Sequence, residues 1–197
     1  VDDMPVYPNQ QVSDALSVFE HPLQDQPTKI GTMLDTLHNY GTKATVAQNG
    51  KRYFGFVTGG TLPAALCARL ISDTWDQSAS VYVSSPIAAV IESICEKWLK
   101  ELFHLPKQTV AGFVNGSSTA TLCGILAARN SILQKQGFDV VANGLRNAPQ
   151  IRVIVSEQSH STVFKALSIA GFGSKDIIKV PCDSQGRIKI ESIPPLD

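Results

Sequence analysis

The stretch IRVIVSEQSHSTVFKALSIAG, residues 151–171, decides the fold expected for this chain. Residues 151–155 form a nearly continuous apolar, β-branched run, which is typical of a strand buried on both faces of a parallel sheet. A helical pattern follows over 161–170, and a second strand is expected at 177–180. A strand, a helix and a strand in succession predict an α/β layered fold.

The same alternation begins upstream, in GFVNGSSTATLCGILAARN, residues 112–130. A short strand is expected near 110–114 and a helix from 119 to about 135. The small residues Gly116 to Thr119 lie between them, where backbone N–H groups, hydroxyls and the positive end of a helix dipole would meet. This combination suits a phosphate group, although Ser and Thr are also ordinary helix caps.

His160 lies at a second strand-to-helix junction, just after the strand expected at 151–155. Ligands of open parallel sheets collect beyond the carboxyl ends of the strands, so both junctions are expected to face one crevice. A single histidine at a helix start is more often a cap or a surface residue than a catalyst. Two polar junctions at one edge of a sheet favour a functional site.

The clearest helix pattern lies in SSPIAAVIESICEKWLKELFHLP, residues 84–106. Ser85 is expected to cap this helix, Pro86 to occupy its first position and Pro106 to end it, which predicts a helix over 86–104. Apolar residues recur every three or four positions and predict a buried face; they are Ile87, Val90, Ile91, Ile94, Trp98 and Leu102.

The first part of the chain is expected to contain less regular structure. Residues 1–50 are interpreted as an arm with short helices near 11–20 and 30–39. A turn-rich, glycine-containing loop over 51–63 follows, and then a helix over 63–76.

The composition is that of an ordinary globular protein. Of the 197 residues, 43% are hydrophobic and 17% are charged, and the net charge is zero. Neither nucleic acid nor an anionic membrane is therefore an expected partner. The apolar stretches are too short to span a bilayer, and a cytoplasmic location is expected. The four cysteines lie far apart, which favours neither a zinc site nor a disulfide framework.

Four sequence blocks in a fixed order resemble one known family. They are YFGFVTGGTLPAAL (53–66), SSPIAAVIESICEKWL (84–99), NGSSTATLCGILAARN (115–130) and SEQSHSTVFKALSIAG (156–171). They resemble the group II pyridoxal-phosphate-dependent amino-acid decarboxylases, which include glutamate, aromatic-amino-acid, histidine and diaminobutyrate decarboxylases. The resemblance runs from about residue 50 to the end of the chain.

The resemblance implies a fold and an assembly. The fold is the α/β fold-type I of pyridoxal-phosphate enzymes, a mainly parallel sheet with flanking helices, incomplete because the chain stops early. Residues 1–50 would be the N-terminal arm, and 51–197 the first part of the large, cofactor-binding domain. Family members are homodimers with the site at the interface, so a homodimer is expected here.

The resemblance also assigns roles to residues. Ser117 and Ser118 would hold the phosphate of pyridoxal 5'-phosphate, and His160 would stack on its pyridine ring and serve as a catalytic residue. Phe56 and Thr58 fall in the loop that lines the substrate side in the relatives. Many relatives carry Glu where this chain has Thr119. No metal is implied.

The lysine that binds the cofactor covalently in the family, and the aspartate that pairs with the pyridine nitrogen, match no residue here. Lys165 and Lys179 do not correspond to that lysine, and Lys165 is expected on a helix surface. The chain is therefore expected to be the N-terminal part of a longer enzyme, inactive without its C-terminal remainder.

Other interpretations stay open. The same site residues would suit another fold-type I enzyme, such as an aminotransferase or a different lyase. A truncated, non-catalytic homologue would act as a binding or dimerising module. The sequence does not indicate which amino acid would be the substrate.

Overall fold

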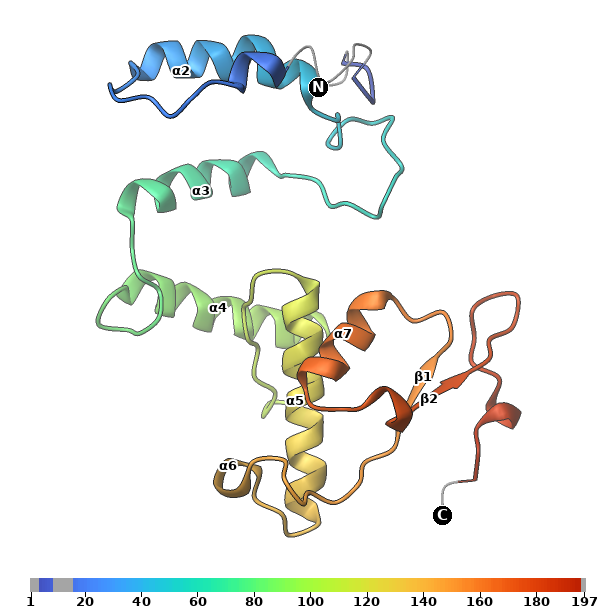
Figure 1. Cartoon of the computed structure of the whole chain (residues 1–197). Coiled ribbons are helices and arrows are strands. Elements are labelled where there is room, and N and C mark those ends of the chain that lie inside the picture. The colour runs from blue at the N-terminus through green and yellow to red at the C-terminus, as the bar shows by residue number, and fades with distance from the viewer. Residues whose placement is uncertain (1–3, 9–15, 196–197) are drawn as a thin grey trace. The chain divides into compact units, whose positions relative to one another are not determined.

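The structure is a computed structural model that describes residues 4–8 and 16–195 (Figure 1). Contacts along the backbone divide the chain into two compact units, Val1–Ser85 and Pro86–Asp197. The division falls immediately before the long helix expected at 86–104. The predicted domain boundary near residue 50 stays a prediction.

Among its described residues, the first unit contains helices α2 and α3. Helix α2 (Ile30–Thr36) continues through a π-helical turn, Leu37–Gly41, so the helix predicted at 30–39 is present. Helix α3 (Pro63–Trp75) begins with proline at its first turn and ends at Asp76, whose φ of 47° is left-handed. Of the helix predicted at 11–20, residues 11–15 lie outside the described residues, and Ser17–Phe19 form a short 3-10 helix.

The second unit contains the α/β part of the fold. Its helices are α4 (Pro86–Leu102), α5 (Ser117–Lys135), α6 (Val140–Asn143) and α7 (Ser161–Ile169), and its strands are β1 (Val153–Ser156) and β2 (Ile177–Val180). The two strands are parallel, with Val153 opposite Ile177 and Ser156 opposite Val180. Helix α7 connects them, which confirms the strand–helix–strand order predicted from residues 151–180.

The core of the second unit lies where α7 packs on α5 and includes residues of the two paired strands. Its apolar residues are almost fully buried; they are Leu133, Val155, Ala166, Leu167, Ala170 and Val180. On α7, positions 166, 167 and 170 lie on one side of the helix, so a single buried stripe attaches this helix to its neighbour.

Helices α5 and α7 end in the same way. In α5, the amide of Phe138 donates to the carbonyl of Leu133 and that of Gly137 to Gln134. In α7, Phe172 and Gly171 donate to Leu167 and Ser168 in the same pattern. These are Schellman motifs, in which a left-handed residue turns the chain away and its neighbours satisfy the last carbonyls. Glycine suits the turn because φ is 76° at Gly137 and 88° at Gly171.

The strand predicted at 110–114 is not formed, and this prediction was wrong. The amide of Ala111 donates to the Glu96 carboxylate on α4 at 3.2 Å. A side chain therefore takes the N–H that a neighbouring strand would have used. After β2, Cys182 and Ile188 form an isolated antiparallel bridge.

Two predictions about α4 were also wrong. Ser85 is 1% exposed, and its hydroxyl has no hydrogen-bond partner among the described residues, so it does not cap the helix. The apolar face predicted to be buried is between 37% and 69% exposed at Ile87, Val90, Ile91, Ile94, Trp98 and Leu102. Packing in this unit joins α5 with α7 and β1 with β2, and it leaves this face of α4 uncovered. Within the described ranges, no helix has the length and apolar character needed to cross a membrane.

Candidate functional site

The turn before α5 holds the first group of candidate residues. Gly116 is the N-cap residue, with φ 89° and ψ 158°, a backbone conformation that L side chains rarely adopt. No side chain caps the helix, and its first turn contains no acidic residue. Ser117 and Ser118 are both exposed. The first N–H groups of a 19-residue helix therefore remain available to an anion, beside two hydroxyls.

Thr119 does not add a third free hydroxyl to this turn. Its Oγ1 donates to the carbonyl of Asn115 at 3.1 Å, and this local hydrogen bond stabilises the turn. At position 119 this chain therefore places a neutral side chain that bonds to its own backbone. An anion at the start of α5 meets no negative charge from Thr119.

His160 is the N-cap residue of α7. Its Nδ1 accepts from the amide of Thr162 at 3.3 Å and lies 2.9 Å from the hydroxyl of the same residue. Because a backbone amide can only donate, the neutral ring carries its proton on Nε2. Hydrogen bonds to Nδ1 lie in the plane of the imidazole, so capping does not occupy the faces of this exposed ring.

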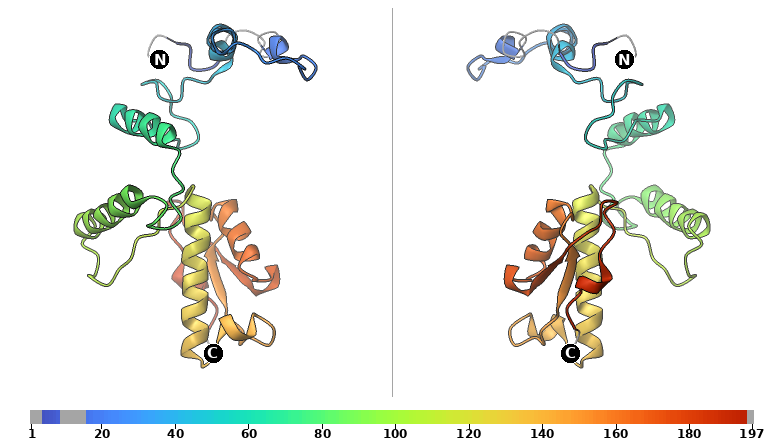
Figure 2. Two further views of the ribbon diagram at one scale, coloured as in Figure 1. Left: turned by 90° about the vertical axis from the view of Figure 1, so that its left-hand side faces the viewer. Right: turned by 90° about the vertical axis from the view of Figure 1, so that its right-hand side faces the viewer.

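The structure brings Ser117, Ser118 and His160 into one unit. Helices α5 and α7 pack against each other and begin at the same end of the second unit (Figures 1 and 2). The carboxyl end of β1 leads directly to His160. The roles of these three residues toward a ligand stay predictions.

Phe56 and Thr58 belong to the first unit, and their part in a common site stays a prediction. Both are exposed, and Phe56 is 95% exposed. Phe56 and Val57 have φ values of 56° and 52°. Left-handed backbone is uncommon for bulky residues and a genuine outlier for a β-branched one. The loop therefore has an unusual backbone conformation beside Thr58.

Glu96 is a residue that the sequence analysis missed. Its carboxylate accepts from Ala111 and forms an ion pair with Lys100 at 2.8 Å, so it ties α4 to the segment that leads to the Gly116 turn. The Lys100 hydrogen bond, followed by that from Ala111, holds the pKa of Glu96 below its ordinary value of 4.5. The spacing of Glu96 and Lys100 predicts the ion pair, but nothing in the sequence indicates Ala111.

The lysines and the potential metal ligands add no further site. Lys165 is exposed on α7, and the Nζ of Lys179 lies 4.7 Å from the centre of the Phe164 ring. In the part of the chain that the structure describes, no three His, Cys, Asp or Glu side chains gather as a metal site would require.

The sequence matches one protein family over most of its length. The model of the family described as "Pyridoxal-dependent decarboxylase conserved domain" matches residues 14–194. The chain belongs to this family. Tryptophan decarboxylase 1 of Oryza sativa subsp. japonica is 30% identical over 144 residues, which cover 68% of this chain and 27% of that protein.

Solved structures of pyridoxal-dependent decarboxylases share the fold. The structure of mouse CSAD in its apo form superposes with a TM-score of 0.84 and 21% identity, over 98% of this chain and 39% of that chain. Oryza sativa TDC with PLP and tryptamine gives a TM-score of 0.79 and 22% identity, over 93% of this chain and 40% of that chain. The predicted fold is confirmed, and the chain spans less than half the length of each of these relatives.

Proposed function

We propose that the protein containing this chain is a pyridoxal-phosphate-dependent amino-acid decarboxylase, a carboxy-lyase of amino-acid and carboxylic acid metabolism. The observation that carries the proposal is the start of α5, where Gly116 replaces a side-chain cap and Ser117 and Ser118 are exposed. A phosphate dianion fits such a helix start. Membership of the decarboxylase family supports the choice of pyridoxal phosphate among phosphate-bearing ligands.

The chain's own residues would bind and orient the cofactor. The hydroxyls of Ser117 and Ser118 and the first amides of α5 donate to the phosphate. The imidazole of His160 would contact the pyridine ring, and its Nε2–H would remain available as a proton donor. Phe56 and Thr58 would contact the substrate. Bound pyridoxal phosphate supplies an electron-accepting ring that lowers the barrier to loss of the carboxylate as carbon dioxide.

The isolated chain would bind the cofactor weakly and would not turn over substrate. The proposal therefore includes a C-terminal remainder of the enzyme, which brings the lysine expected from the family. It also includes a homodimer in the cytoplasm. The uncovered apolar face of α4 supports a further protein surface at this place, because large apolar patches on soluble proteins mark contact sites.

Titration of the complete protein with pyridoxal 5'-phosphate tests the phosphate assignment. The double variant Ser117→Ala with Ser118→Ala is expected to weaken binding by about 1.5–3 kcal/mol for each hydroxyl at most, since the backbone donors remain. Ser131→Ala removes an exposed hydroxyl further along α5 and is the matched control. Unchanged affinity in the double variant would contradict the assignment.

Carbon dioxide release from a panel of L-amino acids tests the reaction. A decarboxylase releases carbon dioxide and leaves an amine. Transfer of the amino group without carbon dioxide would instead identify an aminotransferase of the same fold.

A further inference from the structure

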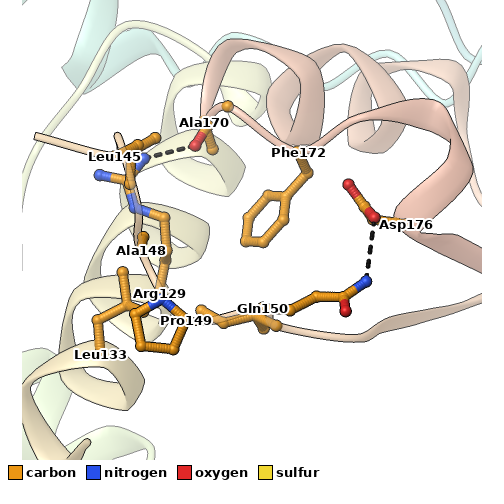
Figure 3. A pocket seen from close by; sticks show the side chains of 11 residues that line it. Arg129, Leu133, Leu145, Ala148, Pro149, Gln150, Ala170, Phe172 and Asp176 are labelled. Atoms are coloured by element: carbon orange, nitrogen blue, oxygen red, sulfur yellow. Dashed lines mark hydrogen bonds between the residues drawn. The ribbon is translucent and has the colours of Figure 1, made fainter. Parts of the chain in front are cut away.

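Arg129 on α5 makes a bond to the end of α7. Its Nη1 donates to the backbone carbonyl of Ala170, a residue that is 1% exposed (Figure 3). The guanidinium is held from its other side, because Nε and Nη2 donate to Oδ1 of Asn130 at 3.0 and 2.9 Å. The bonds to Asn130 thus fix the orientation of the planar guanidinium, whose Nη1 bonds to α7.

The backbone carbonyl of Ala170 accepts none of the hydrogen bonds that end α7. The Schellman motif uses the carbonyls of Leu167 and Ser168, and Ala166 accepts from the amide of Ala170 itself. The carbonyls at a helix C-terminus also carry partial negative charge, which favours a cationic donor. Arg129 therefore supplies a charge-assisted bond at a point where α7 has no partner of its own for this carbonyl.

The end of α7 borders an open pocket on one side, although Ala166, Leu167 and Ala170 are themselves buried. A pocket of about 260 Å³ lies beside Arg129, between the end of α7 and the segment before β1. Figure 3 shows Phe172 and Leu145 on its walls, with Asp176 at its far side. Because the pocket leaves one side of the helix end unfilled, loss of the Arg129 bond removes a constraint that apolar packing does not supply on that side.

The position of this bond relates it to the candidate site. Arg129 follows Ser117 by 12 residues on α5, which is about 18 Å of helix. Ala170 follows His160 by 10 residues on α7, about 15 Å. The two lengths are nearly equal. A bond between Arg129 and Ala170 at one end of the helix pair therefore keeps the first residues of α5 and α7 at a similar height at the opposite end. Both starts do lie at one end of the unit (Figure 2).

We propose that Arg129 is a positioning residue that sets the register of α7 on α5, and thereby the separation between the phosphate-binding turn at Ser117 and the ring of His160. This role rests on the proposed function. Arg129 touches neither the cofactor nor the substrate, and it acts through His160. A purely structural role would change the stability of the protein without acting through His160.

A double-mutant cycle on the complete protein separates these roles. The variants are Arg129→Met, which keeps the apolar stem and removes the donors, His160→Ala, and both together. Leu133→Val in the same helix is the matched control, because it loosens buried packing and retains the bond. The measurements are the dissociation constant of pyridoxal 5'-phosphate, its visible circular dichroism when bound, and the unfolding midpoint.

We expect Arg129→Met to bind pyridoxal 5'-phosphate about tenfold more weakly and to show a smaller circular dichroism band. Arg129→Lys, which keeps a charged donor, recovers part of the affinity. In the His160→Ala background, Arg129→Met has little further effect, because the residue it positions is gone. Leu133→Val lowers the unfolding midpoint and leaves cofactor affinity unchanged.

Two other results overturn the inference and can be told apart. In the first, His160→Ala weakens cofactor binding, and Arg129→Met either has no effect or weakens binding by the same factor with and without His160. Arg129 then does not act through His160, and the proposed function stands. If His160→Ala leaves affinity unchanged, the ring contact in the proposed function fails as well. Should Arg129→Met not fold, Asn130→Ala replaces it in the cycle, since it removes only the brace of the guanidinium.

Discussion

Leu133 and Leu167 occupy the same position in two helix C-termini. The carbonyl of each accepts from a phenylalanine amide five residues later, at 2.9 Å from Phe138 and 3.0 Å from Phe172. Both leucines are almost fully buried, at 1% and 3% exposed. The repeated pattern Leu-x-x-x-Gly-Phe therefore ends both helices of the α5–α7 pair, and it explains why each chain reversal occurs where it does.

Alanine at the two glycines of this pattern is expected to destabilise the chain by different amounts. The left-handed backbone costs an alanine about 1–2 kcal/mol at either position. At Gly137 the added Cβ meets no atom within 4 Å, whereas at Gly171 it overlaps Cδ1 of Leu145. Gly171→Ala should therefore lower the free energy of unfolding more than Gly137→Ala, as measured by urea denaturation. Equal losses would show that Leu145 moves aside freely.

His104→Gly is expected to stabilise the chain. Helix α4 ends with the same hydrogen bonds, Leu105 to Lys100 and His104 to Glu101, but its left-handed residue is His104, with φ 51°. Relief of this strain outweighs the added freedom of glycine in the unfolded chain, for a gain of about 0.5–1 kcal/mol. His104→Ala removes the imidazole but keeps the strain, and it should give no such gain. Stabilisation by both variants would assign the effect to the imidazole.

The helix patterns were predictable because helix formation depends on neighbours in sequence. Helices α3, α4, α5 and α7 all lie close to where apolar periodicity and helix propensity predict them. The absence of a strand at 110–114 was not predictable, because a strand needs a neighbouring strand as its partner. The amide of Ala111 bonds to Glu96 instead. Sequence spacing cannot reveal a bond between a helix side chain and a backbone amide 15 residues later.

Acid is expected to weaken the tie between Glu96 and Ala111. The pKa of Glu96 is lowered in the folded chain by Lys100 and then by Ala111. Its contribution to stability is therefore complete above the ordinary value of 4.5 and is lost as the pH falls through the lowered folded pKa. Glu96→Gln should reduce the loss of stability in this acid range, measured as unfolding midpoint against pH. Glu92→Gln, on the same helix, is the control for removing one negative charge from α4.

Trp98→Ala tests what the exposed face of α4 does. The side chain is 65% exposed, so its loss should change the stability of this chain by no more than about 0.5 kcal/mol. In the complete protein the same change should cost about 3–5 kcal/mol, if another surface buries the ring. Lys97→Ala, an exposed neighbour, should have little effect in either case. Equally small losses for Trp98→Ala in both proteins would show that this face is not an interface.

The candidate site shows what a sequence motif does and does not indicate. The small-residue turn before α5 was predictable, but Gly116 as the cap residue, and Thr119 bonded to Asn115, come only from the structure. The capping bonds of His160 were foreseen as the alternative to a catalytic role. The structure shows those bonds and leaves the ring faces exposed, so capping and cofactor contact are compatible.

Two substitutions at His160 separate these roles in the complete protein. His160→Asn retains a side chain that caps helices well and removes the aromatic ring. His160→Phe retains a flat ring and removes the acceptor for the Thr162 amide. If His160 both caps α7 and contacts the cofactor ring, Asn keeps the unfolding midpoint and weakens pyridoxal 5'-phosphate binding. Phe should lower stability by about 0.5–2 kcal/mol and keep much of the affinity. The opposite result would be that His160→Asn binds the cofactor like the unaltered protein and His160→Phe binds it weakly. His160 would then only cap α7, and the assignment of a ring contact would be wrong.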